Sequence, residues 1–507
     1  MLSVWQSGNE MKLLNNGLAL LAGMTCVLGF APFGLYPVPV IALAALFALW
    51  SHAATPRQAA GLGLFFGLGL FGTGVSWIYV ALHDYGDMSM WLAALATVLF
   101  AAFLSLFTAL AGYLQSRFAR APQPVRIALA MPAAWVLIEW LRGTIFTGFP
   151  WLTLGYAQSS SMLSGYAPVL GAYGVSLVAA ICAGLITLFW LKRRPIAIFA
   201  LAVILIAGAT LRSIAWTHPE GQPFSVSLVQ GNIPQDIKFN PEVLNDTLNT
   251  YKNLILQHPA KLTVLPETAF PMMEDEVPQP LLEELRNQAI KNGGDLLIGS
   301  FERENGGYYN SVFSIGVSRN GQHYRKHHLV IFGEFIPLRP VFGWLINDVL
   351  QIPMGDLARG ALTQPPLEVS GQHVAVDICY EDVFGEEIIT TLPDATLLVN
   401  VTNDAWYGDS FAAAQHRQMS QMRALETGRM MLRATNTGET VIIGADGRVL
   451  KQLPQHERAV LQGIAQGYQG ITPYVRFGNA AVLLLIALML ASARWFFRRK
   501  SAQGRPV

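Results

Sequence analysis

Charged side chains are scarce in this sequence of 507 residues. Only 13% are Asp, Glu, Lys or Arg, whereas 52% are hydrophobic. A soluble globular protein carries about 25% charged residues, so this composition indicates a membrane protein. The charges are also nearly balanced, with a formal net charge of +1, and no basic cluster is interleaved with aromatic residues. The sequence therefore lacks the electrostatic signature of a protein that binds nucleic acid.

Several patterns that would indicate other chemistries are also missing. None of the ten histidines has an aspartate five residues later, which excludes acyltransferases of the His-x4-Asp type. His327 and His328 are adjacent and lack the spacing of metal ligands, so we expect no metal site. The segment GLGLFG (67–72) fits the pattern G-x-G-x-x-G, but it lies inside an apolar run with no strand before it. Close helix packing is therefore favoured there over nucleotide binding.

Long apolar runs divide the chain into three parts. Runs of about 17 to 25 residues can cross a membrane as helices. Eight such runs cover residues 14–31, 36–52, 60–82, 89–113, 125–142, 167–191, 195–214 and 477–495. We therefore predict a bundle of seven spans over 1–215, a globular domain over 216–475, and an eighth span with a tail over 476–507.

The charges in the short loops indicate how the chain is oriented. With eight spans, one side of the membrane receives Lys12, Arg57, Arg117, Arg120, Arg126, Lys192–Arg194 and Arg498–Lys500. The short loops on the opposite side, around 32–36 and 83–88, carry no lysine or arginine. By the positive-inside rule, both termini are cytoplasmic and the globular domain faces away from the cytoplasm.

Cysteine is rare as well. Cys26 and Cys182 lie in predicted spans, so the globular domain holds only Cys379 and cannot form an internal disulfide. In an oxidising compartment a lone thiol is a liability unless it is used. The alternative is a buried, inert cysteine, which is common. The cysteine count alone leaves both interpretations open.

The globular domain is predicted to alternate strands with helices. Runs rich in β-branched residues and bounded by turn residues are expected to be strands. They cover residues 224–230, 262–266, 295–300, 308–317, 373–380, 395–401 and 440–444. Apolar residues at helical spacing predict helices over about 244–255, 280–291 and 411–431. This alternation indicates an α/β domain with layered sheets.

Cys379 is expected at a turn from a strand to a helix. VAVDICY has the character of a strand, and EDVFGEEIIT follows with apolar residues at helical spacing. The neighbours Asp377, Glu381 and Asp382 should keep the thiol protonated, whereas a helix N-terminus would stabilise a thiolate. The thiol therefore requires a counter-charge and a proton acceptor from elsewhere in the chain.

Two other segments can supply these groups. Glu267 lies in LPETAF directly after a predicted buried strand, and Lys326 and Glu334 lie in YRKHHLVIFGEFIPL. A glutamate that takes the thiol proton, a thiolate that attacks a carbonyl and a lysine that stabilises the oxyanion form a coherent set. Each residue alone is explained equally well by a surface ion pair or a helix cap. The set of three carries the prediction.

These blocks resemble the three signatures of the nitrilase, or carbon–nitrogen hydrolase, superfamily. PET, YRKHHLVIFGE and DICYED occur in the matching order. Within this superfamily, the flanking spans, EWLRGTIFTGFPWLTLGYAQ (139–158) and LVQGNIPQ (228–235) resemble bacterial apolipoprotein N-acyltransferases over essentially the full length. The resemblance implies a nitrilase-like αββα sandwich in the periplasm, on a bundle of about eight spans in the bacterial inner membrane. We expect a monomer.

The resemblance also assigns roles to single residues. It implies that Glu267 is the general base, that Lys326 stabilises the oxyanion, and that Cys379 is the nucleophile. The supporting or substrate-binding positions that it implies are Glu334, Tyr380 with its backbone N–H, Glu381, Trp151 at a membrane-facing entrance, and Trp406 in a loop near the site. At Phe239 this sequence departs from the tryptophan that is frequent in the family, which puts the role of that position in doubt.

The resemblance implies a ping-pong acyl transfer. Cys379 takes an acyl chain from the sn-1 ester of a phospholipid, such as phosphatidylethanolamine, and releases a lysophospholipid. The α-amino group of a lipoprotein whose N-terminal cysteine carries diacylglycerol then attacks the thioester. This reaction needs no metal, nucleotide or other cofactor.

Two other functions are compatible with parts of the sequence. A membrane-anchored amidase or hydrolase of the nitrilase type would use the same three residues and deliver the acyl group to water. A transporter would show inverted repeats and charges inside the spans, and neither pattern is evident. The acyltransferase is therefore the main hypothesis, and the hydrolase is the alternative.

Two loops and one charged pair are open to more than one interpretation. Segments 305–309 and 339–365 are long enough to act as lids over a site. Glu139 and Arg142 lie three residues apart at the end of a span. A mutual ion pair is favoured there over contact with lipid headgroups.

Overall fold

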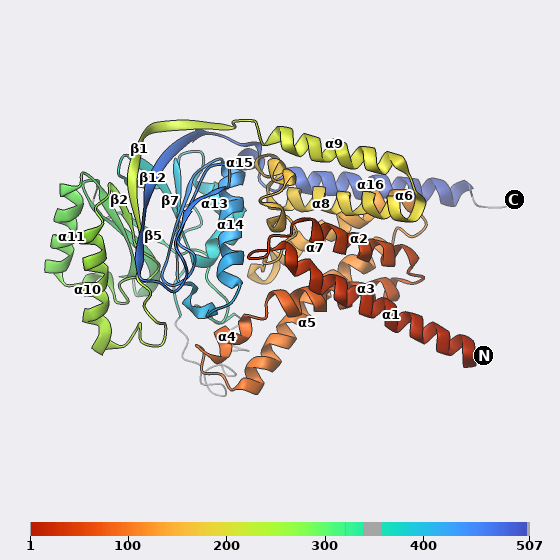
Figure 1. The fold of residues 1–507 in the computed structure, drawn as a ribbon, viewed down its shortest axis with the longest axis horizontal. Coiled ribbons are helices and arrows are strands. Elements are labelled where there is room, and N and C mark those ends of the chain that lie inside the picture. Colours follow the sequence, from red (N-terminus) through yellow and green to blue (C-terminus); the bar gives the residue numbers. More distant parts are fainter. Residues whose placement is uncertain (1, 320, 338–355, 504–507) are drawn as a thin grey trace. The chain divides into compact units, whose positions relative to one another are not determined.

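The computed structural model describes residues 2–319, 321–337 and 356–503. The chain divides into two compact units (Figure 1). The helical unit consists of Met1–Tyr79, Ser89–Ile214 and Phe477–Val507, and the α/β unit of Val80–Met88 and Ala215–Arg476.

The helical unit contains a helix at each of the eight predicted spans. They are α1 (Leu2–Cys26), α2 (Pro37–His52), α3 (Pro56–Gly74), α5 (Met90–Ser116), α7 (Met131–Arg142), α8 (Ala167–Lys192), α9 (Pro195–Leu211) and α16 (Ala480–Gln503). By length and composition, five described segments can cross a membrane: Glu10–Gly29, Met90–Ser116, Gln123–Arg142, Met162–Lys192 and Ala480–Arg498. Two shorter apolar helices cover Pro37–His52 and Pro195–Leu211. The chain is thus a multi-pass membrane protein.

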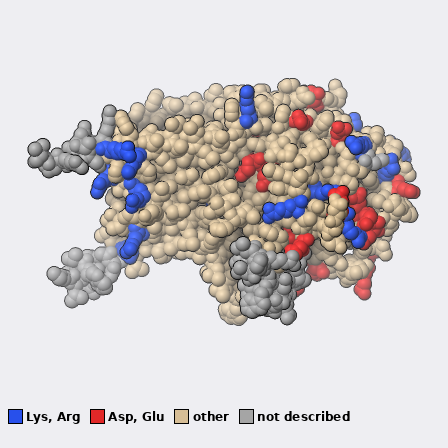
Figure 2. Space-filling view, turned by 180° about the vertical axis from the view of Figure 1, so that it is seen from behind, with Lys and Arg blue, Asp and Glu red and all other residues tan. Residues whose placement is uncertain are grey.

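The surface of the helical unit is apolar. Trp91 is 79% exposed, and Phe199 and Ile206 are each 66% exposed. On the face seen in Figure 2, a group of Lys and Arg side chains lies beside the grey terminal residues, and a wide stretch without charged residues follows it. Such a surface is suited to lipid, since large exposed apolar areas are rare on soluble monomers.

The predicted span over 60–82 is wrong in its second half. Helix α3 ends at Gly74, and a separate short helix, α4 (Ile78–His83), follows. Glycine is a poor helix former, which weakens the helix at this end. A Cβ at Gly74 would lie 2.4 Å from the Leu152 side chain, so the glycine also permits close packing there.

Two of the three glycines of GLGLFG serve helix packing, as the sequence predicts, whereas Gly72 makes no such close approach to other described residues. A Cβ on Gly67 would lie 2.2 Å from Oγ1 of Thr108 on α5, and a Cβ on Gly69 would lie 2.1 Å from the carbonyl oxygen of Leu20 on α1. Small residues at these positions let the backbones of α3, α5 and α1 approach closely.

The α/β unit contains two six-stranded sheets. The first has the order β12-β1-β2-β3-β4-β5, and the second has the order β11-β10-β9-β8-β7-β6. The strands of the first sheet are β12 (Ala459–Gly470), β1 (Thr217–Gln230), β2 (Leu262–Val264), β3 (Asp295–Glu304), β4 (Gly307–Gly316) and β5 (His323–Arg325). Those of the second are β11 (Val449–Gln452), β10 (Val441–Ile443), β9 (Met431–Thr435), β8 (Leu397–Thr402), β7 (Gln372–Ile378) and β6 (Leu367–Val369).

Helices cover the outer face of each sheet, and an apolar core joins the two inner faces. Val226 and Leu297 of the first sheet belong to the same buried cluster as Val376 and Val399 of the second. Helices α10 (Pro241–Gln257) and α11 (Gln279–Lys291) cover the first sheet, and α13 (Gly385–Ile388) and α14 (Ala412–Thr427) cover the second. The layers therefore follow the order αββα (Figure 1).

Parallel strands point the candidate residues to the ends of both sheets. β1, β2 and β3 run parallel in the first sheet, and β7, β8 and β9 run parallel in the second. Glu267 follows β2, Cys379 follows β7 and Asn403 follows β8. The carboxyl ends of parallel strands are a frequent place for functional groups in α/β proteins.

The lid hypothesis for 305–309 is wrong. Glu304 pairs with Gly307 across the turn, so Asn305 and Gly306 alone connect β3 to β4. Both have positive φ, 51° and 79°, which fits a tight two-residue hairpin with the sequence Asn-Gly. The other predicted lid, 339–365, lies mostly outside the described residues.

Candidate active site

Glu267 is buried at the end of β2 and is held by three donors. Its Oε1 accepts a hydrogen bond from Asn310 Nδ2 at 2.7 Å and lies 3.3 Å from Lys326 Nζ. Its Oε2 accepts a hydrogen bond from the backbone N–H of Asn403 at 3.0 Å. Charge-assisted bonds of this kind fix the direction of a carboxylate. The Glu267 carboxylate is thus held in a fixed orientation.

Lys326 lies just after β5, and its side chain is only 1% exposed. Besides Glu267, its Nζ contacts Glu334 Oε1 at 2.8 Å. Burial opposes the charge, but Glu334 and Glu267 outweigh this effect and raise the pKa of Lys326 well above its usual value. Lys326 is therefore an ammonium group at neutral pH.

Glu334 completes this group of charges. Its Oε2 accepts a hydrogen bond from the backbone N–H of Val330 at 2.8 Å, and its Oε1 lies 3.4 Å from Asn310 Nδ2. Asn310 thus contacts both carboxylates. The two carboxylates of Glu267 and Glu334 thus share the ammonium group of Lys326.

Cys379 lies directly after β7 and begins a short 3₁₀ helix, Cys379–Val383. Its side chain is buried, and its φ of 56° is in the left-handed region, which is unusual for a residue other than glycine. The predicted turn after the strand is confirmed. The helix that follows it, α13, has only four residues, so stabilisation of a thiolate by a long helix dipole is not available here.

Burial raises the pKa of the Cys379 thiol, and the charge of Glu267 raises it further. Lys326 acts in the opposite direction but does not outweigh these effects. Cys379 is thus a thiol in the resting protein, and it must lose its proton to a base before it can attack. The charge of Glu267 acts on this thiol, so Glu267 is the candidate acceptor for that proton.

Glu381 ties the Cys379 turn to the segment that carries Lys326. Its Oε2 accepts hydrogen bonds from the Ile378 N–H at 2.7 Å and from the Tyr324 hydroxyl at 3.0 Å. Its Oε1 accepts from the backbone N–H groups of His327 and His328, at 2.6 and 3.0 Å. Burial raises the pKa of Glu381 to about 7, whereas these donors favour the carboxylate. Glu381 therefore connects the Cys379 turn to the Lys326 segment, and its role in function stays a prediction.

Lys238 is a further buried residue of the site, and the sequence did not predict it. Its side chain is 1% exposed, and its Nζ donates to Thr268 Oγ1 at 2.7 Å and to the carbonyl oxygen of Glu267 at 3.1 Å. Burial lowers its pKa to about 8, although Glu267 and Cys379 act in the opposite direction. The only sequence signal was a lysine between two apolar residues in DIKFN.

The predicted neighbours of the three central residues lie at different depths. Phe239 follows Lys238 and is 51% exposed, with its ring 6.3 Å from that of Phe301. Tyr380 is buried, and its ring lies 5.2 Å from Phe384. Trp406, three residues after Asn403, is 41% exposed, and its ring lies 6.4 Å from that of Tyr85.

Trp151 belongs to the helical unit, where its side chain is fully buried 5.0 Å from the ring of Trp77. Arg142 Nη1 donates to the Trp151 carbonyl oxygen at 2.7 Å, and Glu139 Oε1 accepts from the Leu154 N–H at 3.0 Å. These two charged residues thus bind the backbone of the segment that follows them, and their mutual ion pair stays a prediction.

Among the residues that the structure describes, no group of three or more His, Cys, Asp or Glu side chains is arranged to hold a metal ion. His328 Nδ1 instead lies 2.7 Å from Glu387 Oε1, and His327 Nδ1 lies 2.8 Å from the carbonyl oxygen of Gly360. The three central side chains are a carboxylate, an ammonium group and a thiol, a combination suited to attack on a carbonyl carbon.

Comparisons with known proteins match both parts of the chain. The family described as apolipoprotein N-acyltransferase N-terminal domain matches residues 22–185, and the carbon-nitrogen hydrolase family matches residues 225–466. A protein of Nitrosomonas europaea named apolipoprotein N-acyltransferase is 52% identical over 95% of this chain and 98% of its own length.

Two further relatives with the same name come from Methylococcus capsulatus and Ralstonia nicotianae. Both are 45% identical over 96% of this chain, and the matches cover 98% and 94% of their own lengths.

Proposed function

The chain belongs to the apolipoprotein N-acyltransferase family, so it is a membrane enzyme that N-acylates lipoproteins, and we propose that Cys379 carries the acyl group during the transfer. One observation supports this role above the others. Cys379 is a buried thiol of raised pKa, and the charges of both Glu267 and Lys326 act on it. This supports the proposal that Glu267 acts as the base and Lys326 as the oxyanion-stabilising cation in nucleophilic attack.

The first half-reaction forms a thioester. Glu267 takes the proton from Cys379, and the sulfur attacks the sn-1 ester carbonyl of a phospholipid such as phosphatidylethanolamine. Lys326 and the backbone N–H of Tyr380 stabilise the oxyanion of the tetrahedral intermediate. The C–O bond then breaks, the leaving oxygen takes the proton from Glu267, and a lysophospholipid departs.

The second half-reaction moves the acyl group to nitrogen. The acceptor is a lipoprotein whose N-terminal cysteine already carries diacylglycerol. Its α-amino group has an ordinary pKa near ~7.7, so a substantial neutral fraction is present at neutral pH. The neutral amine attacks the thioester, Glu267 accepts a proton from the nitrogen, and Cys379 leaves and recovers its proton. The product is an amide and the enzyme returns to its initial state.

The membrane arrangement is part of the same proposal. We propose eight spans in the bacterial inner membrane, both termini in the cytoplasm, the α/β unit in the periplasm, and a monomer. The apolar helices and the one-sided basic loops support this arrangement. Glu334, Glu381, Tyr380, Trp406, Phe239 and Trp151 are proposed as supporting or substrate-binding residues.

The main alternative, a nitrilase-type hydrolase, would use water in place of the amine. We expect the purified enzyme, given phosphatidylethanolamine labelled in its sn-1 chain, to release lysophospholipid and to label a diacylated lipopeptide with a free N-terminus. The same lipopeptide with an acetylated N-terminus should stay unlabelled, because it has no nucleophilic amine. Mass spectrometry of the lipopeptide makes the measurement.

Cys379→Ala provides the background for that assay. Release of free fatty acid at the same rate with either lipopeptide would contradict the transferase and favour the hydrolase. Labelling of the acetylated lipopeptide at another position would contradict N-acylation.

A further inference from the structure

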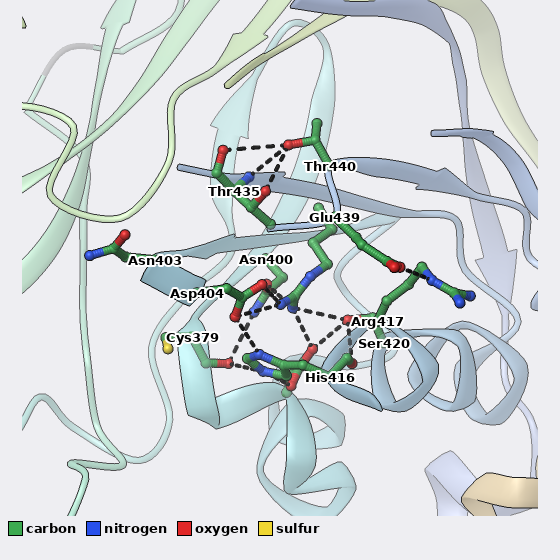
Figure 3. A network of polar contacts seen from close by, with 12 residues as sticks. Cys379, Asn400, Asn403, Asp404, His416, Arg417, Ser420, Thr435, Glu439 and Thr440 are labelled. Atoms are coloured by element: carbon green, nitrogen blue, oxygen red, sulfur yellow. Dashed lines mark hydrogen bonds and ion pairs between the residues drawn. The ribbon is translucent and has the colours of Figure 1, made fainter. Parts of the chain in front are cut away.

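A closed ring of four buried charges lies beside the Cys379 turn. The four residues are His416, Asp382, Arg433 and Asp404. Asp382 contacts His416 Nε2 through Oδ1 at 2.9 Å and Arg433 Nη1 through Oδ2 at 3.1 Å. Asp404 closes the ring, because its Oδ2 lies 3.0 Å from Arg433 Nη2 and its Oδ1 lies 3.0 Å from His416 Nδ1. All four side chains are at most 1% exposed. The members come from four elements: the 3₁₀ helix at Cys379, the turn Asp404–Tyr407, α14 and β9 (Figure 3).

The geometry requires that His416 be charged. Its Nδ1 faces the carboxylate of Asp404, and its Nε2 faces the carboxylate of Asp382 and, at 3.1 Å, the carbonyl oxygen of Cys379. Because these partners only accept hydrogen bonds, both ring nitrogens must donate, which makes the ring an imidazolium. Burial and Arg433 oppose this charge, but the two aspartates outweigh them and raise the pKa of His416 to about 9. The positive charges of His416 and Arg433 then balance the negative charges of Asp382 and Asp404.

The ring reaches the nucleophile through the Cys379 carbonyl group. His416 Nε2 donates to this oxygen at 3.1 Å, and Asn400 Nδ2 lies 3.3 Å from it. Asn400 is itself fixed, because its Oδ1 accepts from Arg433 Nη1 at 2.6 Å. Figure 3 shows the carbonyl oxygen of Cys379 facing this network and the sulfur on the other side. The network thus holds the backbone of Cys379 and leaves the side chain to the site.

The planar peptide bond carries this constraint to the next residue. The C=O of Cys379 and the N–H of Tyr380 belong to one trans peptide group, so they point in opposite directions. A carbonyl held toward His416 therefore directs the Tyr380 N–H away from the ring. The left-handed φ of Cys379 shows that this orientation is not the one that the backbone would adopt by itself.

We propose that His416 is a positioning residue: together with Asn400, its imidazolium fixes the Cys379 carbonyl and so aims the Tyr380 N–H at the oxyanion. This inference rests on the proposed thioester mechanism, in which that N–H is one of the two oxyanion donors. His416 acts through the peptide group and touches neither substrate.

Two substitutions of His416 separate this role from a general structural one. The amide nitrogen of glutamine can reach the place of Nε2, so His416→Gln keeps a donor for the Cys379 carbonyl. The amide nitrogen of asparagine corresponds to Nδ1, so His416→Asn keeps the contact with Asp404 and loses the hydrogen bond to the Cys379 carbonyl oxygen. Both variants lose the same positive charge. A role confined to charge balance would therefore affect them equally.

We expect the rate of Cys379 acylation by phosphatidylethanolamine to fall about 10²-fold or more in His416→Asn, as for loss of an oxyanion donor. In His416→Gln the fall in the acylation rate should be at least five times smaller. The KM for phospholipid should stay within about twofold of wild type in both variants, because neither substitution changes the binding of the phospholipid ground state. Rapid quenching followed by intact mass spectrometry gives the rate. His373→Gln, on an exposed position of β7, is the matched control and should acylate like wild type.

Asn400→Ala is the second variant, for the case that loss of the buried imidazolium prevents folding. It keeps all four ring charges and removes one of the two donors to the Cys379 carbonyl, so a fall of about fivefold or more in acylation is expected. Equal rates in His416→Gln and His416→Asn, or an unchanged rate in Asn400→Ala, would overturn the proposal. If wild-type Cys379 forms no thioester at all, the proposed function itself fails, and this outcome is distinct from the other two.

Discussion

Glu267→Gln is expected to slow the acylation of Cys379 about 10³-fold, which is within the usual contribution of a general base. The thiol has a raised pKa and is protonated at rest, so attack requires a group that removes its proton. Glutamine can keep an acceptor oxygen toward Lys326, but its NH2 group then faces the Asn403 N–H, and it cannot accept the thiol proton. The rate of thioester formation, followed by mass spectrometry after rapid quenching, measures the effect.

The same variant should make the thiol more reactive toward a small reagent. The negative charge of Glu267 raises the pKa of Cys379, so its removal lowers that pKa and increases the thiolate fraction at pH 8. We therefore expect iodoacetamide to modify Cys379 faster in Glu267→Gln than in wild type, while enzymatic acylation collapses. Glu284→Gln, at an exposed helical position, is the control and should change neither rate. Parallel losses of both reactivities would contradict the role of Glu267 as a base.

Lys326→Met is expected to have a comparable effect of about 10³-fold on both half-reactions, because both pass through a tetrahedral oxyanion. Methionine has a similar length but no charge. Its introduction removes a donor from the transition state and leaves Glu267 and Glu334 without their shared ammonium group. Breaking a buried ion pair also costs about 3 kcal/mol of stability, so a lower thermal midpoint should accompany the loss.

The reactivity of the Cys379 thiol again distinguishes a loss of catalysis from a general loss of structure. Lys326 lowers the pKa of Cys379, so its removal should raise that pKa and slow modification by iodoacetamide at pH 8. This change is opposite in sign to that expected for Glu267→Gln. Lys252→Met, which removes a lysine that is 28% exposed and paired with Glu284, should leave activity within about twofold. Faster modification in Lys326→Met would contradict the placement of this cation beside the thiol.

The residues that we propose to carry the chemistry could be predicted from the sequence because they occur in short contiguous blocks. PET, YRKHHLVIFGE and DICYED each place an ionisable residue beside an apolar strand, where such a residue is costly without a function. The groups that position them could not be predicted in this way. Asn310, Asn403 and Lys238 reach Glu267 from three distant segments. Only the folded chain brings them together.

The errors in the secondary structure have local physical causes. Helix 411–431 was predicted too long, because Gly428 ends α14 with a φ of 64° and β9 begins at Met431. The Asn-Gly pair at 305–306 is typical of a β-hairpin turn, and the structure contains this hairpin in place of the predicted lid. Short strands such as β5 and β6, with three residues each, are too brief for a period to be recognised.

The central claim is that Cys379 carries the acyl chain between two substrates. Intact mass of the purified protein after incubation with phosphatidylethanolamine, beside Cys379→Ala, tests it most directly. We predict a gain of one acyl group on the wild-type protein only, removed by hydroxylamine and discharged onto the N-terminal amine of a diacylated lipopeptide. An unmodified wild-type protein that still acylates the lipopeptide, or an active Cys379→Ala variant, would contradict the claim.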